Sequence, residues 1–121
     1  MRAAEGPDME TVLEIHLVVA FLLALCAVIF SWSVMGRRVV NAVAGLQFIV
    51  GLVAAGMLGK NAPPAVWGHL LVGLLILGAY GMAMSAGKRE GGAGRALAFS
   101  IVGFVLVFAN IWLGLHMAGR M

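Results

Sequence analysis

The stretch VLEIHLVVAFLLALCAVIFSWSVM, residues 12–35, determines the structural class of this protein. Apart from Glu14 and His16 near its beginning, it contains no acidic or basic side chain. A helix rises 1.5 Å per residue, so a stretch of this length crosses the roughly 30 Å hydrocarbon core of a bilayer. The pattern predicts a transmembrane helix.

Three further apolar runs follow at residues 39–59, 65–86 and 96–117, separated by short polar breaks. Short connections make consecutive helices antiparallel neighbours. We therefore expect an all-α fold, an integral membrane up-down-up-down four-helix bundle, that forms a single transmembrane domain over residues 1–121. The composition agrees, because 63% of the residues are hydrophobic and 11% are charged, against roughly 25% charged in soluble domains.

The basic residues predict the orientation of the bundle. Cytoplasmic connections of membrane proteins carry an excess of Lys and Arg. One end carries five basic residues and the other three, namely Arg37, Arg38, Lys88, Arg89 and Arg95 against Arg2, Lys60 and Arg120. This predicts a multi-pass protein of the cell (inner) membrane with both termini on the non-cytoplasmic side. Because the basic residues lie at helix ends and form no stripe, nucleic acid is excluded as a partner.

Three histidines, His16, His69 and His116, lie at one predicted depth, each about 20 residues from the basic breaks. An ionisable residue inside a membrane span is costly and is by default a functional hypothesis. The alternative is that a histidine near the interface reaches water or headgroups. It applies most to His116, which is turned away from the small-residue face that carries Asn110.

His16 and His69 share a local pattern. Each is followed by a leucine and, four positions on, by a small residue, Ala20 or Gly73. The repetition suggests a parallel duplication of a two-helix hairpin. Small residues let a flat macrocycle approach the helix, although close packing of two helices explains the same pattern.

The predicted helix arrangement places His16 and His69 on opposite sides of one site. The first and third helices of an up-down bundle are diagonal, so His16 and His69 are predicted to face each other across the core, as the axial ligands of haem b do. Lys60 or Arg120 would meet the haem propionates at the outer face. Met57 is predicted to border the pocket, either as a cofactor contact or as packing.

Two amides and a tyrosine complete the polar candidates. Gln47 and Asn110 lie deeper in the second and fourth spans and are predicted to hydrogen-bond across helices or to contact a cofactor or quinone. Tyr80 is predicted to pack with its hydroxyl turned toward water. Three histidines are also a ligand set for copper or zinc. The separation of diagonal helices favours a porphyrin over a single small ion.

The order of these features resembles one four-helix half of the haem A synthase family. It rests on Ile15-His16-Leu17, on the stretch from Leu46-Gln47 to Gly51, and on His69-Leu70, and covers about the first 85 residues. The family typically has Arg after the first histidine and Glu three positions before it, where this chain has Leu17 and Leu13. The resemblance therefore implies haem ligation by His16 and His69 and not methyl-group oxidation.

The leading functional hypothesis is a small b-type cytochrome-like protein that transfers electrons, with a bis-histidine haem near the outer face. One alternative is a non-catalytic accessory subunit of a respiratory or photosynthetic complex whose histidines hold a chlorophyll-type pigment. Another is a metal-handling protein that uses all three histidines. The sequence contains no nucleophile–base set, which favours a carrier or subunit over an enzyme. The expected partners are the lipid bilayer, quinone, other membrane subunits or a second copy of the chain.

Overall fold

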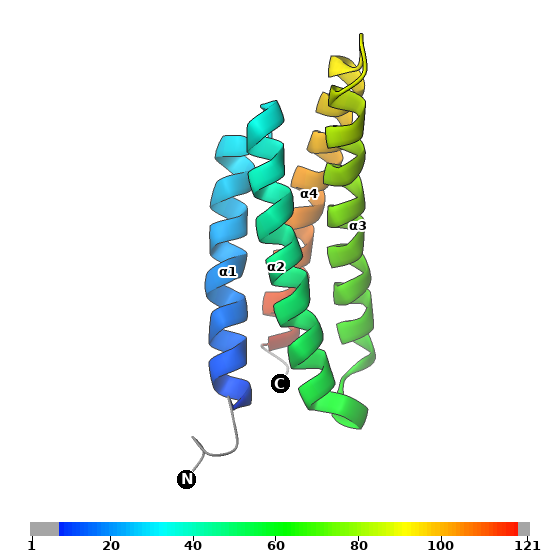
Figure 1. Cartoon of the computed structure of the whole chain (residues 1–121). Helices are drawn as coiled ribbons and strands as arrows, with labels where there is room; N and C mark the ends of the chain where they lie inside the picture. The colour runs from blue at the N-terminus through cyan, green and yellow to red at the C-terminus, as the bar shows by residue number, and fades with distance from the viewer. Residues whose placement is uncertain (1–7, 119–121) are drawn as a thin grey trace.

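The computed structural model describes residues 8–118, which form four long α-helices and one short 3-10 turn. The helices are α1 (Met9–Phe30), α2 (Val34–Leu58), α3 (Pro64–Gly87) and α4 (Ala93–Ala118), with the 3-10 turn η2 (Gly59–Asn61) between α2 and α3. They run antiparallel in chain order (Figure 1). Each of the four is long and apolar enough to cross a membrane. The prediction of a helical bundle of four such helices is confirmed.

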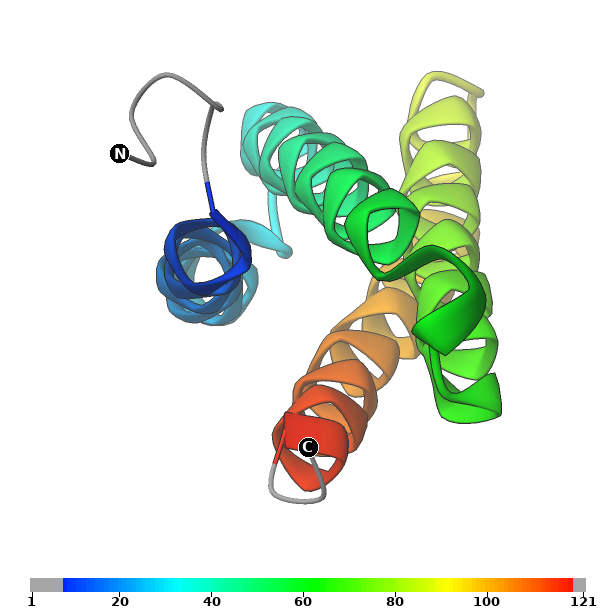
Figure 2. The same cartoon turned by 90° about the horizontal axis from the view of Figure 1, so that it is seen from below.

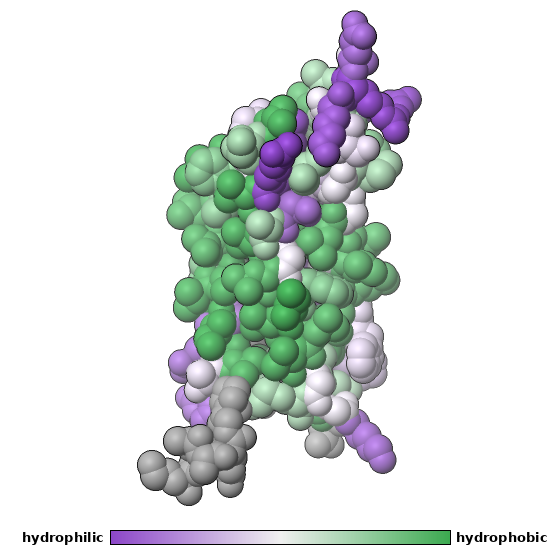
Figure 3. Space-filling view, viewed as in Figure 1, coloured by the Kyte–Doolittle hydropathy of each residue, from purple (hydrophilic) through white to green (hydrophobic). Residues whose placement is uncertain are grey.

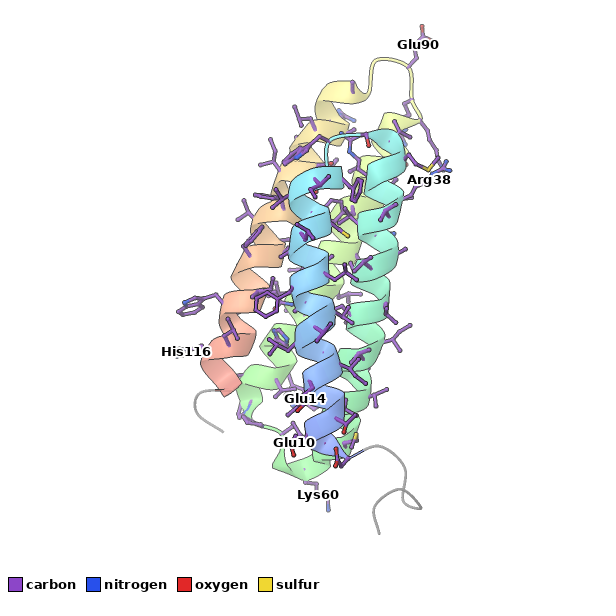
Figure 4. All side chains as sticks on the ribbon, turned by 90° about the vertical axis from the view of Figure 1, so that its left-hand side faces the viewer. Glu10, Glu14, Arg38, Lys60, Glu90 and His116 are labelled. Carbon is purple, nitrogen blue, oxygen red and sulfur yellow. The ribbon has the colours of Figure 1, made fainter. Side chains whose placement is uncertain are left out.

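The helices are arranged around a square, with α1 opposite α3 and α2 opposite α4 (Figure 2). Among neighbouring pairs, α1 and α4 make the least contact, so the bundle is loosest on that side. We call the end where α1 begins and η2 lies the histidine end, and the end where α1 joins α2 and α3 joins α4 the basic end. Glu10, Glu14 and Lys60 mark the histidine end, and Arg38 and Glu90 mark the basic end (Figure 4).

The face of the bundle drawn in Figure 3 is apolar along its middle and carries hydrophilic side chains at both ends. Large hydrophobic side chains on all four helices are exposed, for example Phe21, Ile49, Leu71 and Val105. The interior holds smaller side chains, since much of the buried core consists of alanine and valine. Apolar exteriors of this kind suit contact with lipid, where exposed hydrophobic side chains carry no cost.

The connection between α1 and α2 differs from the predicted one. The break lies at residues 31–33 and not at 36–38, so Arg37 belongs to the first turn of α2. Ser33 caps that turn by accepting a hydrogen bond from the Gly36 amide at 2.9 Å, which satisfies an otherwise free helical donor. A side chain at Gly36 would overlap the Phe30 carbonyl oxygen. Glycine at position 36 therefore allows the first turn of α2 to pack closely against the end of α1. Arg37, the next residue, is buried.

The turn between α2 and α3 sets the shape of the histidine end. Gly59 caps α2 with a φ of +54°, a conformation that glycine adopts without strain. The chain then passes through η2, and Pro64 occupies the first turn of α3, where the missing proline N–H would have no helical acceptor. The reversal takes Lys60 to the tip of the bundle (Figure 4).

Candidate histidine-lined cavity

His16 of α1 and His69 of α3 meet across the bundle. Their Nε2 atoms are 3.5 Å apart, and their rings are perpendicular with centroids 5.8 Å apart. The two helices are diagonal, and 53 residues separate the two histidines along the chain. The structure therefore brings together the two imidazoles that the sequence pairs, with the same ring nitrogen of each pointing toward the other.

Glycines on the flanking helices make room for both rings. A Cβ added at Gly51 of α2 would lie 3.4 Å from Cε1 of His16, and one added at Gly114 of α4 would lie 3.1 Å from Cε1 of His69. The second distance is shorter than ordinary van der Waals contact, so a side chain at Gly114 would displace the ring. The imidazoles are thus held against bare backbone on α2 and α4.

A cavity of about 560 Å³ surrounds the histidine pair. Its wall is mostly apolar and comes from all four helices, with Ala20 and Gly73 below the histidines and Ile76 and Val107 at greater depth. Leu17 of α1 and Leu115 of α4 belong to the wall and are also exposed. The cavity therefore opens sideways between α1 and α4, where the bundle is loosest, and its volume lies in the roughly 300–1,000 Å³ range of small-molecule pockets.

Gln47 and Asn110, together with the histidines, supply the polar side chains of the cavity interior. Gln47 donates its Nε2–H to the backbone carbonyl of His16 at 2.8 Å, which is the interhelical bond predicted for it. Four buried atoms of these residues have no hydrogen-bond partner within residues 8–118, namely Nδ1 of His16 and of His69, Oε1 of Gln47 and Oδ1 of Asn110. Unpaired buried polar atoms are uncommon in native proteins, so this concentration calls for an explanation.

Met57 and Lys60, which were predicted to contact the cofactor, lie outside the cavity. Met57 is exposed and Lys60 lies at the tip of the bundle, and neither belongs to the wall of the cavity. Met57 was placed by depth alone, but residues of α2 that line the cavity follow the face of Gln47, and Leu58 occupies that face at the outer end. A third predicted contact, Arg120, lies outside the described residues.

His116 does not join the histidine pair. Its ring is exposed and stacks on Trp112, one turn earlier in α4, with centroids 5.0 Å apart and an interplanar angle of 9°. The side chain lies on the outside of the bundle (Figure 4). Within residues 8–118, no group of three or more His, Cys, Asp or Glu side chains is placed to hold a metal ion. His116 was predicted at the same depth as His16 and His69, but its side chain points away from the face of α4 that carries Asn110.

The opening of the cavity carries negative charge, whereas the basic residues Lys60 and Arg120 were predicted there. Glu10 and Glu14 of α1 belong to the wall of the cavity and are exposed at the histidine end. The sequence pattern had assigned these two residues no role in the site. Their spacing from Leu13 and Leu17 along one helical face is the signal that places them at the opening.

A second group of polar residues, which we call the basic-end cluster, consists of Ser31, Arg37, Tyr80 and Ser100. All four are buried. Arg37 donates its Nε–H to the Ser31 carbonyl at 3.0 Å and to the Ser100 hydroxyl at 2.7 Å, and the hydroxyls of Tyr80 and Ser31 are 2.7 Å apart. The prediction that the Tyr80 hydroxyl turns toward water is therefore wrong, because this hydroxyl pairs with the Ser31 hydroxyl inside the bundle.

Comparison of the chain with protein-family models, with curated proteins and with solved structures found no match. Neutral imidazole nitrogens can bind a metal or exchange a proton, and the apolar wall can accommodate a flat hydrophobic ligand.

Proposed function

We propose that this chain is a membrane electron carrier of the b-type cytochrome kind, in which His16 and His69 bind haem b within the cavity. The observation that carries the proposal is the 3.5 Å separation of the two Nε2 atoms. A metal–imidazole bond is roughly 2 Å long, so two ligands on opposite sides of one metal ion need roughly 4 Å. The rings have to separate by about half an ångström to meet this requirement.

The residues around the pair fit the macrocycle. A cavity of about 560 Å³ with an apolar wall is much larger than a single metal ion needs and is of the kind that binds flat hydrophobic ligands. Gly51 and Gly114 leave backbone and not side chains against the imidazoles, and Gly73 lines the cavity one turn below His69. The order of features that resembles one half of haem A synthases supports the same ligand.

The donor set favours electron transfer over oxidation of a substrate. When bound, haem supplies a one-electron ferric–ferrous couple. If His16 and His69 both held the haem iron, they would leave no position on it for oxygen or substrate. The role of the chain's residues is then to hold both imidazoles at a fixed distance and to exclude water through the apolar wall. A membrane quinol is the proposed donor, and the acceptor lies at the histidine end, which we place on the non-cytoplasmic face.

The test is spectroscopic. Protein purified in detergent, with hemin supplied during expression or added afterwards, should give a Soret band and a sharpened α-band on reduction. His16→Ala and His69→Ala should each abolish this spectrum, and His116→Ala, the matched control on the outside of α4, should retain it. A wild-type protein that takes up no hemin contradicts the proposal. A long-wavelength pigment band would instead favour the accessory-subunit alternative.

A copper site is a second candidate, favoured by the acidic opening. Glu10 and Glu14 attract cations and repel the carboxylates of a propionate-bearing ligand. Two imidazoles also suit copper as ligands. Metal analysis of the same preparation separates the two candidates. One equivalent of copper that is lost in His16→Ala and His69→Ala, together with no Soret band, would replace the haem proposal.

A further inference from the structure

We propose that Gln47 and Asn110 are positioning residues that accept the Nδ1–H of His16 and His69, so that both Nε2 lone pairs face one metal centre. The inference rests on the proposed function, since it assigns the tautomer of the two ligands. Metal-binding histidines almost always donate their second ring N–H to an acceptor, which fixes ring orientation and makes the ligand more basic.

In the described part of the chain, the cavity contains two unpaired ring nitrogens and two unpaired amide oxygens, so each possible donor has a possible acceptor. Each imidazole leaves one buried ring nitrogen without a partner, and each amide leaves one buried oxygen without a partner. An Nδ1–H is a donor and an amide oxygen is an acceptor. Two donors and two acceptors are therefore brought into one cavity, with Gln47 beside His16 and Asn110 beside His69.

The position of Gln47 supports its pairing with His16. Its Nε2 donates to the carbonyl of His16 at 2.8 Å, and a carbonyl can accept only from the nitrogen of an amide. The orientation of this amide is therefore fixed by its partner, and Oε1 is the atom left free beside His16. Gly51, one turn further along α2, lies against the same imidazole.

Asn110 has the corresponding position on α4. It lies beside the His69 ring, and its amide nitrogen would be 3.7 Å from a Cβ at Gly73, one turn below His69. Gly114, one turn further along α4, lies against the same imidazole. An amide followed four residues later by a glycine thus occurs on α2 facing His16 and on α4 facing His69.

This repetition extends the duplication suggested by the sequence. Each helical hairpin, α1–α2 and α3–α4, contributes one histidine from its first helix and one amide–glycine pair from its second. The sequence hides the second pair because the spacing from histidine to amide differs. The stretches of α3 and α4 between the histidine depth and the basic end are longer than those of α1 and α2, and the connection at residues 88–92 is longer than the one at 31–33. An amide–glycine pair on each side of the cavity is expected if both imidazoles require the same tautomer.

The tautomers have a consequence for binding. A neutral imidazole protonated at Nδ1 carries its lone pair on Nε2. If both amides accept from Nδ1, two lone pairs face each other at 3.5 Å, an arrangement that a cation between them stabilises. The amides thereby favour the metal-bound state over direct hydrogen bonding between the rings, which requires one Nε2 to carry a proton.

The experiment uses full-length protein in detergent loaded with hemin. Gln47→Leu and Asn110→Leu should each weaken hemin binding roughly 10–100-fold and raise the midpoint potential, because a less basic imidazole stabilises ferric iron less. Asn110→Asp offers a stronger acceptor and should lower the potential below that of wild type. The matched control is Asn41→Leu, since Asn41 is also an amide on α2 with an unpaired oxygen but lies outside the wall of the cavity.

The outcomes separate the two proposals. If wild type takes up no hemin, the proposed function fails and this inference fails with it. If wild type binds hemin and both leucine variants keep its affinity and potential, the inference alone is overturned. If the leucine variants do not fold, the direction of the Asn110→Asp shift decides, because a potential at or above the wild-type value contradicts the proposed hydrogen bond.

Discussion

Arg37 of α2 donates its Nε–H to the Ser100 hydroxyl of α4 at a distance of 2.7 Å, and the same Nε–H reaches the Ser31 carbonyl at the end of α1 at 3.0 Å. One guanidinium therefore connects three helices at the basic end. It also lies near Gly87, the last residue of α3. Positive charge is favourable beside the carboxyl ends of helices, so the ends of α1 and α3 offset part of the cost of burying this cation in the first turn of α2.

Replacement of Arg37 should destabilise the bundle more than replacement of its neighbour. Arg37→Leu leaves the Ser31 carbonyl and the Ser100 hydroxyl without their donor, which we expect to cost about 2–4 kcal/mol of unfolding free energy. Arg38 is exposed, so Arg38→Leu should change that free energy by less than about 0.5 kcal/mol. Unfolding of detergent-solubilised protein by SDS measures both. Equal effects of the two variants would show that the interior hydrogen bonds do not stabilise the fold.

Tyr80 and Ser31 form a pair whose coupling can be measured directly. Their hydroxyls are 2.7 Å apart and both residues are fully buried. Tyr80→Phe removes one partner and should lower the unfolding free energy by about 1 kcal/mol. A double-mutant cycle with Ser31→Ala should give a coupling energy of about 0.5–1.5 kcal/mol. The same cycle with Ser85→Ala, an exposed serine of α3, should give none, and similar values for both cycles would contradict the assigned bond.

Gly114 tests how closely His69 is held. A Cβ at this position would lie 3.1 Å from the imidazole, so Gly114→Val should push the ring from its place. We expect hemin affinity to fall roughly tenfold or more, in keeping with the cost of overpacking a filled site. The control is Gly78→Val, because Gly78 of α3 is exposed and has open space around it. Unchanged hemin binding in Gly114→Val would mean that the ring is free to move.

The proposed orientation can be tested with single cysteines. Cys26 is the sole cysteine and is buried, so a Cys26→Ala background is free of thiols. Lys60→Cys in that background should react with a membrane-impermeant thiol reagent in intact cells, because the positive-inside rule places the histidine end outside. Glu90→Cys should react only after the membrane is opened. The reverse labelling pattern would invert the topology and place the cavity at the cytoplasmic face.

Much of the fold follows from local pattern. Apolar runs predicted four helices, and short connections predicted their antiparallel order, because both features depend on composition and chain length. Helix boundaries were less accurate. Gly36-Arg37-Arg38 reads as a polar break, yet Ser33 caps α2 and Gly36 fits beneath it, so Arg37 is helical and buried. Composition marks a charged residue as exposed, and only the partners available in three dimensions change that outcome.

The histidine pair shows where sequence reasoning about a site succeeds and where it stops. Depth and helix order predicted that His16 and His69 would meet, because both can be counted along the chain. The angle between His116 and Asn110 can also be counted along α4, and it set His116 apart from the pair. The face that a helix turns toward the cavity and the path of a turn cannot be counted, and Met57 and Lys60 therefore lie away from the cavity.

By itself, the sequence determined the number of helices, their apolar character and the depth of the histidines, since each is set by residue type and by the constant rise of a helix. The tertiary structure alone decided which atoms are neighbours: Nε2 of His16 beside Nε2 of His69, glycine backbone against each ring, and Arg37 among three helices. The reason is that contacts between helices depend on rotation about each axis, which packing of the whole bundle fixes.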